Sequence, residues 1–428
     1  MSNDEFIQQH LQDDTRALAL KRMPEGVDAA WCLQQIEGWQ LARKKLPQWA
    51  ATQGLWFPPR LSMEQCSSEL TATYKHHLVT RLLPTPADRG LMIDLTGGFG
   101  VDFSYIAPAF QRPIYVERQE ALCNVARHNL PLLNLPQAEV ICADTQTSAD
   151  LLAQTYDLAF IDPARRDNIG RKVVGISDCT PDLTMLQDHI KARYLMVKLS
   201  PMLDITQALR DLHSVCEVHV ISVAGECKEL LLVIKGHTNQ TADIDPTATN
   251  IDPEATAGRA QHPADPAACT IHCVNLNTAD PEFSTSANEI RHTQPTIAPQ
   301  PLSYLYEPNA SILKGGAQDV LCHKLGLSKL HPMSNLYVSE NQATDYPGRT
   351  FCIEAWSDFG KKSLRTLLAD TPQANLTIRN FPATVAELRK KLKLREGGAT
   401  YLFATTLSDG THALIKCRKA TQNTQNSL

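Results

Sequence analysis

Acidic residues follow four apolar segments in the first half of this 428-residue sequence. Asp94 follows LMI, Glu117 follows RPIYV, Asp144 follows EVICA and Asp162 follows YDLAFI. If these segments are parallel strands, their carboxyl ends meet at one edge of a sheet, where open α/β sheets bind their ligands. We therefore expect the carboxylates to converge on one crevice. Taken alone, Glu117 or Asp144 is equally compatible with capping a helix.

A glycine-rich turn follows the first of these segments. After Asp94, alternate positions are occupied by Thr96, Gly98 and Gly100, which matches an acidic-x-Gly-x-Gly-x-Gly pattern with Thr96 in place of the first glycine. Glycine lets the backbone turn sharply and approach a ligand without a Cβ in the way. The helix expected next offers free N–H groups and the positive end of its dipole. The turn therefore predicts a cradle for a nucleotide-like cofactor.

The next two acids suit the rest of such a cofactor. Glu117 stands 23 positions after Asp94, and a carboxylate at the end of the second strand can accept hydrogen bonds from both ribose hydroxyls. Asp144, after the third strand, can meet an adenine amino group.

The order of the apolar segments distinguishes between cofactor classes. Five of them are separated by helix-length intervals, as in parallel βαβ units. The following two have only AGECK between them, which predicts an antiparallel hairpin. This ending is typical of the class I methyltransferase sheet, whereas a dehydrogenase sheet continues with another βαβ unit. The predicted cofactor is therefore S-adenosylmethionine. The expected strands are 91–95, 113–117, 138–142, 156–161, 193–199, 215–223 and 229–235.

The reactive part of the site is predicted after the fourth and fifth strands. In amino-methylating enzymes an acidic or amide residue plus proline faces an exocyclic amine, and an aromatic residue follows. Asp162-Pro163 fits this pattern, but Ala164 and Arg165 depart from it. The candidate catalytic residues are Asp162, Pro163, Arg165 and Lys198.

Basic and polar residues of the same two loops are candidates for binding the substrate. Arg165 and Arg166 can hold a phosphate or carboxylate, or can pair with neighbouring acids. Lys198 and Ser200 lie in KLSPMLD, after the fifth strand. Lys198 can bind an anionic group or extend its ammonium to solvent from a strand end. Arg166 and Ser200 are therefore candidate substrate contacts.

Three further features suggest chemistry less strongly. The expected hairpin turn contains Glu226, Cys227 and Lys228, so Cys227 is a candidate nucleophile for carbon methylation; a loop cysteine without such a role is the alternative. Lys75 is expected either to pair with the methionine carboxylate of the cofactor or to be a surface lysine. Cys269-x-x-His272-Cys273 lacks a matching ligand pair, so no metal is predicted.

Length and composition predict two or three domains and no membrane span. A helical region is expected over 1–88, where one helix from Ser62 repeats apolar residues every four positions and stops before Pro84. Residues 237–268 are rich in Thr, Ala, Asp and Pro and predict a flexible acidic linker. The polar N-terminus lacks the features of a signal peptide, so a cytoplasmic protein is expected.

The net charge of −5 conceals a basic C-terminal part, because residues 379–419 carry nine Lys or Arg against three acids. Such a segment can meet phosphates or can be a solvated helix face. Helices and strands alternate again from about 301 to 420, and Ser408-Asp409-Gly410 predicts the turn of a closing hairpin.

Several motifs occur together in an order that resembles a known family. SMEQCSSELTATYK, DLTGGFGVD, IDPARR, KLSPMLD, GECKELLLV, YLYEPNASILKGG and RNFPATVAELRKKLKLREGGATYLFATT are similar to the bacterial class I methyltransferases whose C-terminal domain is called THUMP-like. The resemblance implies an α/β fold with a Rossmann-like sheet and a helical N-terminal region. The domains are then 1–88 (helical), 89–236 (methyltransferase), 237–268 (linker), 269–308 (small ferredoxin-like element) and 309–428 (THUMP-like).

True THUMP domains bind RNA in tRNA-modifying enzymes, so the resemblance implies an RNA substrate, tRNA or rRNA. The basic residues Arg389, Lys390, Lys391 and Lys393 are candidates for phosphate contacts. Two alternatives remain at this stage: a methyltransferase that acts on a protein or small molecule, and a non-catalytic RNA-binding protein that retains the cofactor fold. The sequence leaves the oligomeric state open.

Overall fold

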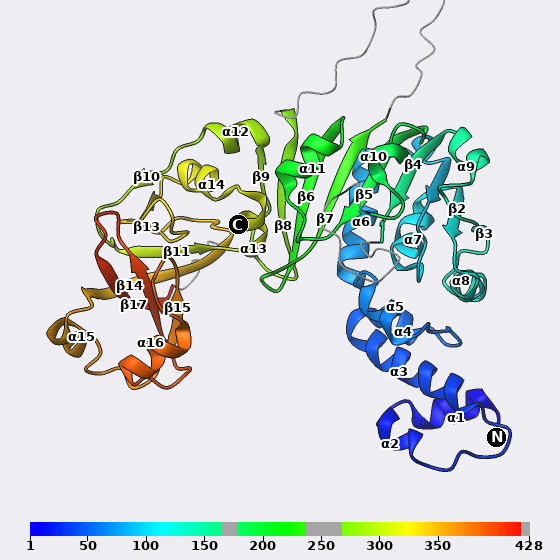
Figure 1. Ribbon diagram of the computed structural model, residues 1–428, viewed down its shortest axis with the longest axis horizontal. Helices are drawn as coiled ribbons and strands as arrows, with labels where there is room; N and C mark the ends of the chain where they lie inside the picture. Colours follow the sequence, from blue (N-terminus) through cyan, green and yellow to red (C-terminus); the bar gives the residue numbers. More distant parts are fainter. Residues whose placement is uncertain (165–175, 177–178, 237–267, 421–428) are drawn as a thin grey trace, which may run out of the picture. The chain divides into compact units, whose positions relative to one another are not determined.

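The computed structural model describes residues 1–164, 176, 179–236 and 268–420 (Figure 1). Arg165, Arg166 and all but the last residue of the expected linker 237–268 lie outside the described residues. The described chain divides into two compact units, one formed by 1–216 with 231–236 and the other by 217–230 with 268–420. No described helix is long and apolar enough to cross a membrane.

The chain begins with six helices, as expected for the N-terminal region. The single helix predicted from Ser62 is wrong, because α5 ends at Gln65 and α6 starts at Glu69. The side chain of Ser68 accepts a hydrogen bond from the N–H of Thr71 at 3.3 Å, so it caps a new helix rather than continuing the old one. The helices are α1 Asn3–His10, α2 Thr15–Ala19, α3 Ala29–Lys45, α4 Pro47–Ala51, α5 Arg60–Gln65 and α6 Glu69–Leu82.

An extended segment between α4 and α5 ties the N-terminal helices to the α/β region. The side-chain amide of Gln35 on α3 accepts from the N–H of Phe57 at 2.7 Å and donates to its carbonyl at 3.0 Å. Asn129, on α8 (Glu120–Leu132), makes the same pair of bonds with Trp56, both at 2.8 Å. Each side-chain amide thus bonds to the N–H and the carbonyl of one residue, as the backbone of a neighbouring strand would, and leaves neither group without a partner.

The predicted sequence of parallel strands is confirmed. The hydrogen-bonded order of the nine-stranded sheet is β3-β2-β1-β4-β5-β7-β6-β8-β9, with parallel pairing from β3 to β5. Strands β6 and β7 are joined by Ala224-Gly225, both with positive φ, as a two-residue hairpin requires. The strands are β1 Leu91–Asp94, β2 Arg112–Glu117, β3 Glu139–Cys142, β4 Tyr156–Ile161, β5 Ala192–Leu199, β6 Val215–Val223, β7 Glu226–Lys235, β8 Thr270–Leu276 and β9 Phe283–Ser286.

Short helices connect these strands. They are η1 Pro86–Asp88, α7 Val101–Ile106, η2 Ala107–Ala109, α8, α9 Ala149–Ala153, α10 Leu183–Leu186 and α11 Ile205–Asp211. Phe99, in the glycine-rich turn before α7, packs edge-to-face on Trp49 of α4 at 4.8 Å between ring centroids. A buried apolar cluster that includes Phe57, Met63 and Val101 surrounds this contact, so the N-terminal helices support the turn.

The second unit is built around an eight-stranded sheet, β10-β12-β13-β11-β14-β17-β16-β15. Side chains alternate between its two faces: Phe403 and Ile415 belong to one buried cluster, whereas Leu402 and Leu414 belong to another. The elements are α12 Ala287–His292, β10 Thr296–Ile297, β11 Tyr304–Pro308, α13 Ala310–Gly315, α14 Gln318–Lys324, β12 Ser328–Lys329, β13 Tyr337–Ser339, β14 Gly348–Asp358, α15 Lys361–Leu367, β15 Asn375–Ile378, α16 Val385–Leu392, β16 Thr400–Thr406 and β17 His412–Lys419.

Replacing Asn129 with Ala should lower the free energy of unfolding by ~1–3 kcal/mol, because both backbone groups of Trp56 lose their partner. Chemical unfolding of the full chain measures the change. Asn124→Ala is the matched control, since Asn124 is an exposed residue of the same helix. Equal losses in the two variants would show that the amide pair does not hold the segment.

Candidate active site

A cleft of about 900 Å³ lies at the carboxyl ends of the parallel strands, within the size range of small-molecule sites. Nine of the eleven candidate cofactor-binding and catalytic residues line it, so the expected convergence is found in the structure. The predicted residues among its lining are Asp94, Thr96, Gly98, Gly100, Glu117, Asp144, Asp162, Pro163 and Lys198.

The glycine-rich turn leaves its backbone close to the cleft. Gly98 and Gly100 have φ of 56° and 84°, in the left-handed region that glycine occupies without strain. Gly97 lies against Tyr115 of β2, and a Cβ built on it would stand 2.2 Å from the ring. The Tyr115 hydroxyl also donates a hydrogen bond to the carbonyl of Gly98. The turn is thus held on the end of β2.

Glu117 is fixed by the backbone around it. One carboxylate oxygen accepts the N–H of Gly98 at 2.9 Å and the other accepts the N–H of Gln119 at 2.8 Å. Each carboxylate oxygen has a second lone pair. The side chain is buried and belongs to the cleft lining, so it is oriented to accept hydrogen bonds from a pair of neighbouring hydroxyls.

Asp94 is 1% exposed at the end of β1. Burial raises its pKa well above the usual range, and the charges of Asp102 and Asp162 add to this effect. The N–H of Thr96, which donates to its carboxylate at 3.0 Å, acts in the opposite direction. The side chain of Thr96 has a role that glycine could not fill. Its hydroxyl accepts a hydrogen bond from the N–H of Asp162 at 2.6 Å, which links the turn to the loop after β4.

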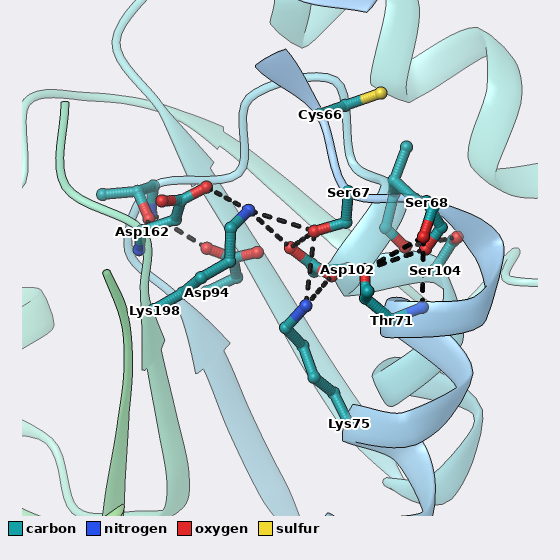
Figure 2. Close-up of polar contacts among 12 residues, drawn as sticks. Cys66, Ser67, Ser68, Thr71, Lys75, Asp94, Asp102, Ser104, Asp162 and Lys198 are labelled. Carbon is teal, nitrogen blue, oxygen red and sulfur yellow. Dashed lines mark hydrogen bonds and ion pairs between the residues drawn. The ribbon is translucent and has the colours of Figure 1, made fainter. Parts of the chain in front are cut away.

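In the wall of the cleft, one carboxylate holds two buried lysines (Figure 2). Asp102, in the first turn of α7, contacts Lys75 at 3.0 Å and Lys198 at 3.1 Å. The Ser67 hydroxyl donates to Asp102 at 2.7 Å and accepts from Lys198 at 3.0 Å. Burial opposes the ionisation of Asp102, but the two ammonium charges outweigh it, so its pKa lies below the usual range.

Lys198 joins this network to the predicted reactive residue. Its ammonium group also pairs with the carboxylate of Asp162 (Figure 2). Asp162 is the more exposed partner, with 39% of its side chain accessible against 11% for Lys198. The pair therefore presents an oriented acceptor oxygen to the cleft while the lysine balances its charge.

Other predicted residues lie elsewhere. Lys75 is fully buried, so the expectation of a surface lysine is wrong. Its ammonium group pairs with Asp102 and does not belong to the cleft lining, where pairing with the methionine carboxylate of the cofactor would require it. Ser200 is buried beside the cleft without lining it, and accepts the N–H of Met202 at 3.1 Å. Arg165 and Arg166 cannot be placed, since they lie outside the described residues.

The expected hairpin nucleophile has the wrong environment. The Cys227 thiol donates to the carbonyl of Ala310 at 3.4 Å, and burial raises its pKa to about 11. A nucleophilic cysteine requires a lowered pKa. Lys228, the neighbouring cation that could lower this pKa, pairs with Glu226 at 2.7 Å instead. All of these contacts lie within the second unit.

Sequence reasoning missed Ser67 and Asp102. A signal for Asp102 was present, because an acid stands between Val101 and Phe103 in an otherwise apolar first helical turn. A carboxylate that is buried with such neighbours requires a partner, because an unpaired buried charge is costly. Ser67 carried a weaker signal. It lies in the break between α5 and α6, and the sequence predicted one continuous helix there.

The fold and the site define the class of protein. Five parallel strands followed along the chain by the β6–β7 hairpin, with a glycine-rich turn after the first strand and acids after the next strands, form a Rossmann-like methyltransferase domain of class I. Strands β8 and β9 extend the sheet beyond this hairpin. The cleft fits the cofactor of that class, S-adenosylmethionine, because the glycine-rich turn brings backbone close to the cleft beside Glu117, whose fixed carboxylate can accept hydrogen bonds from two hydroxyls.

Comparisons with known proteins agree with this class. Residues 348–419 match the THUMP domain-like family and 304–347 match a ferredoxin-like domain. A protein of Porphyromonas gingivalis W83, whose crystal structure is described as that of a methyltransferase, is 32% identical, with 98% of both chains covered and a TM-score of 0.81. The chain belongs to this family of class I S-adenosylmethionine-dependent methyltransferases with a C-terminal THUMP-like domain.

Two proteins of Mycobacterium tuberculosis, from strains CDC 1551 and H37Rv, are also similar. Each carries the name uncharacterized S-adenosylmethionine-dependent methyltransferase and is 31% identical over 140 residues, or 32% of this chain. The chain spans 37% of the length of these curated relatives. The ferredoxin-like match begins at 304, downstream of most of the segment 269–308 for which that element was expected, and β8 of that segment pairs with β6.

Replacing Asp94 or Asp102 with Asn should have different effects on the free energy of unfolding. Asp102→Asn should lower the free energy of unfolding by ~3–5 kcal/mol at neutral pH, because it leaves two buried ammonium groups without their carboxylate. Asp94→Asn should leave the ligand-free protein at least as stable as the wild type, because it removes a carboxylate whose ionisation is costly. Unfolding as a function of pH measures both effects.

The sign of the pH dependence follows from the directions of the pKa shifts. For Asp94 the raised pKa gives stability that is present below the ordinary Asp pKa and is lost as pH rises through the raised value. For Asp102 the lowered pKa gives stability that is present above the ordinary value and is lost as pH falls through the lowered one. A similar loss in both variants at neutral pH would contradict this assignment.

Proposed function

We propose that this protein transfers the methyl group of S-adenosylmethionine to an acceptor atom in RNA. The observation that carries the methyl-transfer part is the cleft in which Asp94, Glu117 and Asp162 converge beside the glycine-rich turn. The RNA part is supported by the THUMP domain-like match over 348–419, since THUMP domains bind RNA in tRNA-modifying enzymes.

The cofactor would be held by backbone and carboxylate groups together. Glu117 would accept the ribose hydroxyls, and Asp144, which is exposed at the cleft, would face the adenine amine. The turn from Thr96 to Gly100 would surround the methionine part. When bound, S-adenosylmethionine supplies an electrophilic methyl group on a positively charged sulfur.

The acceptor would be oriented by Asp162. Its N–H is held by Thr96 and its carboxylate by Lys198, so the remaining acceptor capacity has a fixed direction. A carboxylate in this position can take a hydrogen bond, and then a proton, from a nucleophilic N–H or O–H group. Because the methyl donor is already reactive, alignment of the two groups would provide much of the rate enhancement.

The basic residues in and after α16 differ in how far their side chains are available for phosphate contacts. Arg389 donates to the carbonyl of Ala374 at 3.2 Å and lies 3.5 Å from Glu396, so part of its role is structural. Lys390 and Lys393 are exposed, and Lys393 caps the C-terminus of the helix in a left-handed conformation. We assign RNA phosphate binding to Lys390 and Lys393 first, and to Lys391 second, because Lys391 lies over the ring of Phe359 at 5.9 Å.

Titration calorimetry should show binding of S-adenosylmethionine that Glu117→Ala weakens at least tenfold, because the variant removes a preformed acceptor for both ribose hydroxyls. Glu120→Ala is the control, since Glu120 lies three residues further along in the first turn of α8 and is exposed. Unchanged affinity in Glu117→Ala would exclude this orientation of the cofactor.

Labelled S-adenosylmethionine should transfer its methyl group to RNA extracted from a deletion strain, and much less to RNA from the parent strain, whose sites are already methylated. Asp162→Asn should bind the cofactor but lose most of the transfer. Label that enters protein or a small molecule instead would overturn the RNA assignment and keep the methyltransferase. Cofactor binding without transfer to any cellular fraction would favour a non-catalytic RNA-binding protein.

A further inference from the structure

Three metal-ligating side chains meet on one face of two neighbouring strands in the second unit. Strands β6 and β8 lie side by side (Figure 1). Glu217 and His219 alternate along β6, and His272 lies opposite His219 in the parallel register of the two strands. One oxygen of Glu217 lies 2.9 Å from Nε2 of His219 and 3.8 Å from Nε2 of His272. The ligand atoms of the three residues all lie within 4.8 Å of one another.

A second contact sets the direction of the His272 ring. Its Nδ1 is hydrogen-bonded to the hydroxyl of Ser284, on the adjacent strand β9, at 2.8 Å. This leaves Nε2 as the atom that faces Glu217. Histidines that bind metals usually have the other ring nitrogen held in this way by a neighbouring group. His219 is buried and the side chains of Glu217 and His272 are mostly buried, so the cluster is not a chance gathering of surface groups.

We propose that Glu217, His219 and His272 bind a divalent transition metal ion, with zinc the best match. Two imidazole nitrogens and one carboxylate oxygen form a donor set that zinc accepts, and three protein ligands leave one position of a tetrahedral site for water or another ligand. The proposed metal would join β6 to β8. This site is separate from the cleft, which lies in the first unit.

The two distances from Glu217 to the histidines are close to those of a tetrahedral zinc site. In a tetrahedral zinc site with bonds of ~2.0–2.1 Å, neighbouring ligand atoms lie roughly 3.3–3.4 Å apart, between the 2.9 Å and 3.8 Å found here. The two imidazole rings are stacked, with 4.5 Å between centroids and 6° between planes. Because a metal lies in the plane of each imidazole that it binds, metal binding would turn the rings out of the stack.

The sequence predicted no metal here, because the cysteine and histidine residues around His272 lack a matching ligand pair. In Cys269-x-x-His272-Cys273, the neighbour of His272 points to the opposite face of the sheet, as alternate strand residues must. There the sulfur of Cys273 packs against Gly315, where a Cβ would stand only 2.8 Å from it. The partners of His272 come instead from β6, far away in the sequence, so local spacing did not reveal them.

The test is a titration of the untagged, chelator-treated full chain with Zn²⁺, by competition with a chromophoric chelator, and with Co²⁺, whose visible absorption reports tetrahedral coordination. In separate titrations, one equivalent of Zn²⁺ or of Co²⁺ should bind per chain. His272→Gln and Glu217→Gln should each remove this binding, and Ser284→Ala should keep the stoichiometry but weaken affinity ~10–100-fold, as expected when an orienting partner is lost.

His323→Gln is the matched control, since His323 is an exposed histidine of the same unit, and it should bind like the wild type. Circular dichroism checks that each variant folds; if His272→Gln does not fold, Glu217→Gln and Ser284→Ala still decide the question. The proposal is overturned if the wild type binds neither ion at a single saturable site. It is equally overturned if the folded Glu217→Gln and Ser284→Ala variants bind zinc as tightly as the His323→Gln control.

Discussion

The arrangement of the cleft depends on one buried carboxylate, Asp102, which holds two lysines from distant parts of the chain. Lys75 comes from the N-terminal helices and Lys198 from the end of β5, and both lie within 3.1 Å of Asp102. Buried ammonium groups are costly unless they are paired and hydrogen-bonded. The folded chain must therefore bring α6, α7 and β5 together at this point. The network orients Lys198, and through it Asp162, without any of these groups having to meet a ligand first.

The glycine-rich turn is also held by contacts with distant parts of the chain. Phe99 packs on Trp49 of the N-terminal helices, Gly97 lies against Tyr115, and Thr96 accepts the N–H of Asp162. The turn is therefore held by α4, β2 and the loop after β4. A rigid turn suits a site in which backbone groups hold the cofactor, because little conformational freedom remains to be lost on binding.

Most strands and the cofactor acids could be predicted from the sequence, because strand ends and glycine turns are local signals. Asp94, Glu117 and Asp162 all reached the cleft for this reason. The helix break before Ser68 and the burial of Lys75 could not be predicted in the same way. The apolar residues that recur every four positions in the predicted helix include Leu70, yet Leu70 is 43% exposed and Lys75 is fully buried. Only the distant partner Asp102 makes that orientation favourable.

The charges around the cleft also account for the opposite behaviour of its two buried aspartates. Among the described residues of this network, Asp94, Asp102 and Asp162 are near two ammonium groups, those of Lys75 and Lys198. Both lysines contact Asp102, and one of them contacts Asp162, so two carboxylates are balanced and Asp94 is not. Protonation of Asp94 makes the group neutral, which agrees with its raised pKa. A positive charge brought into the cleft would favour the ionised form of Asp94 instead. The cleft is thus electrostatically suited to a cationic ligand, which is the charge that a sulfonium cofactor carries.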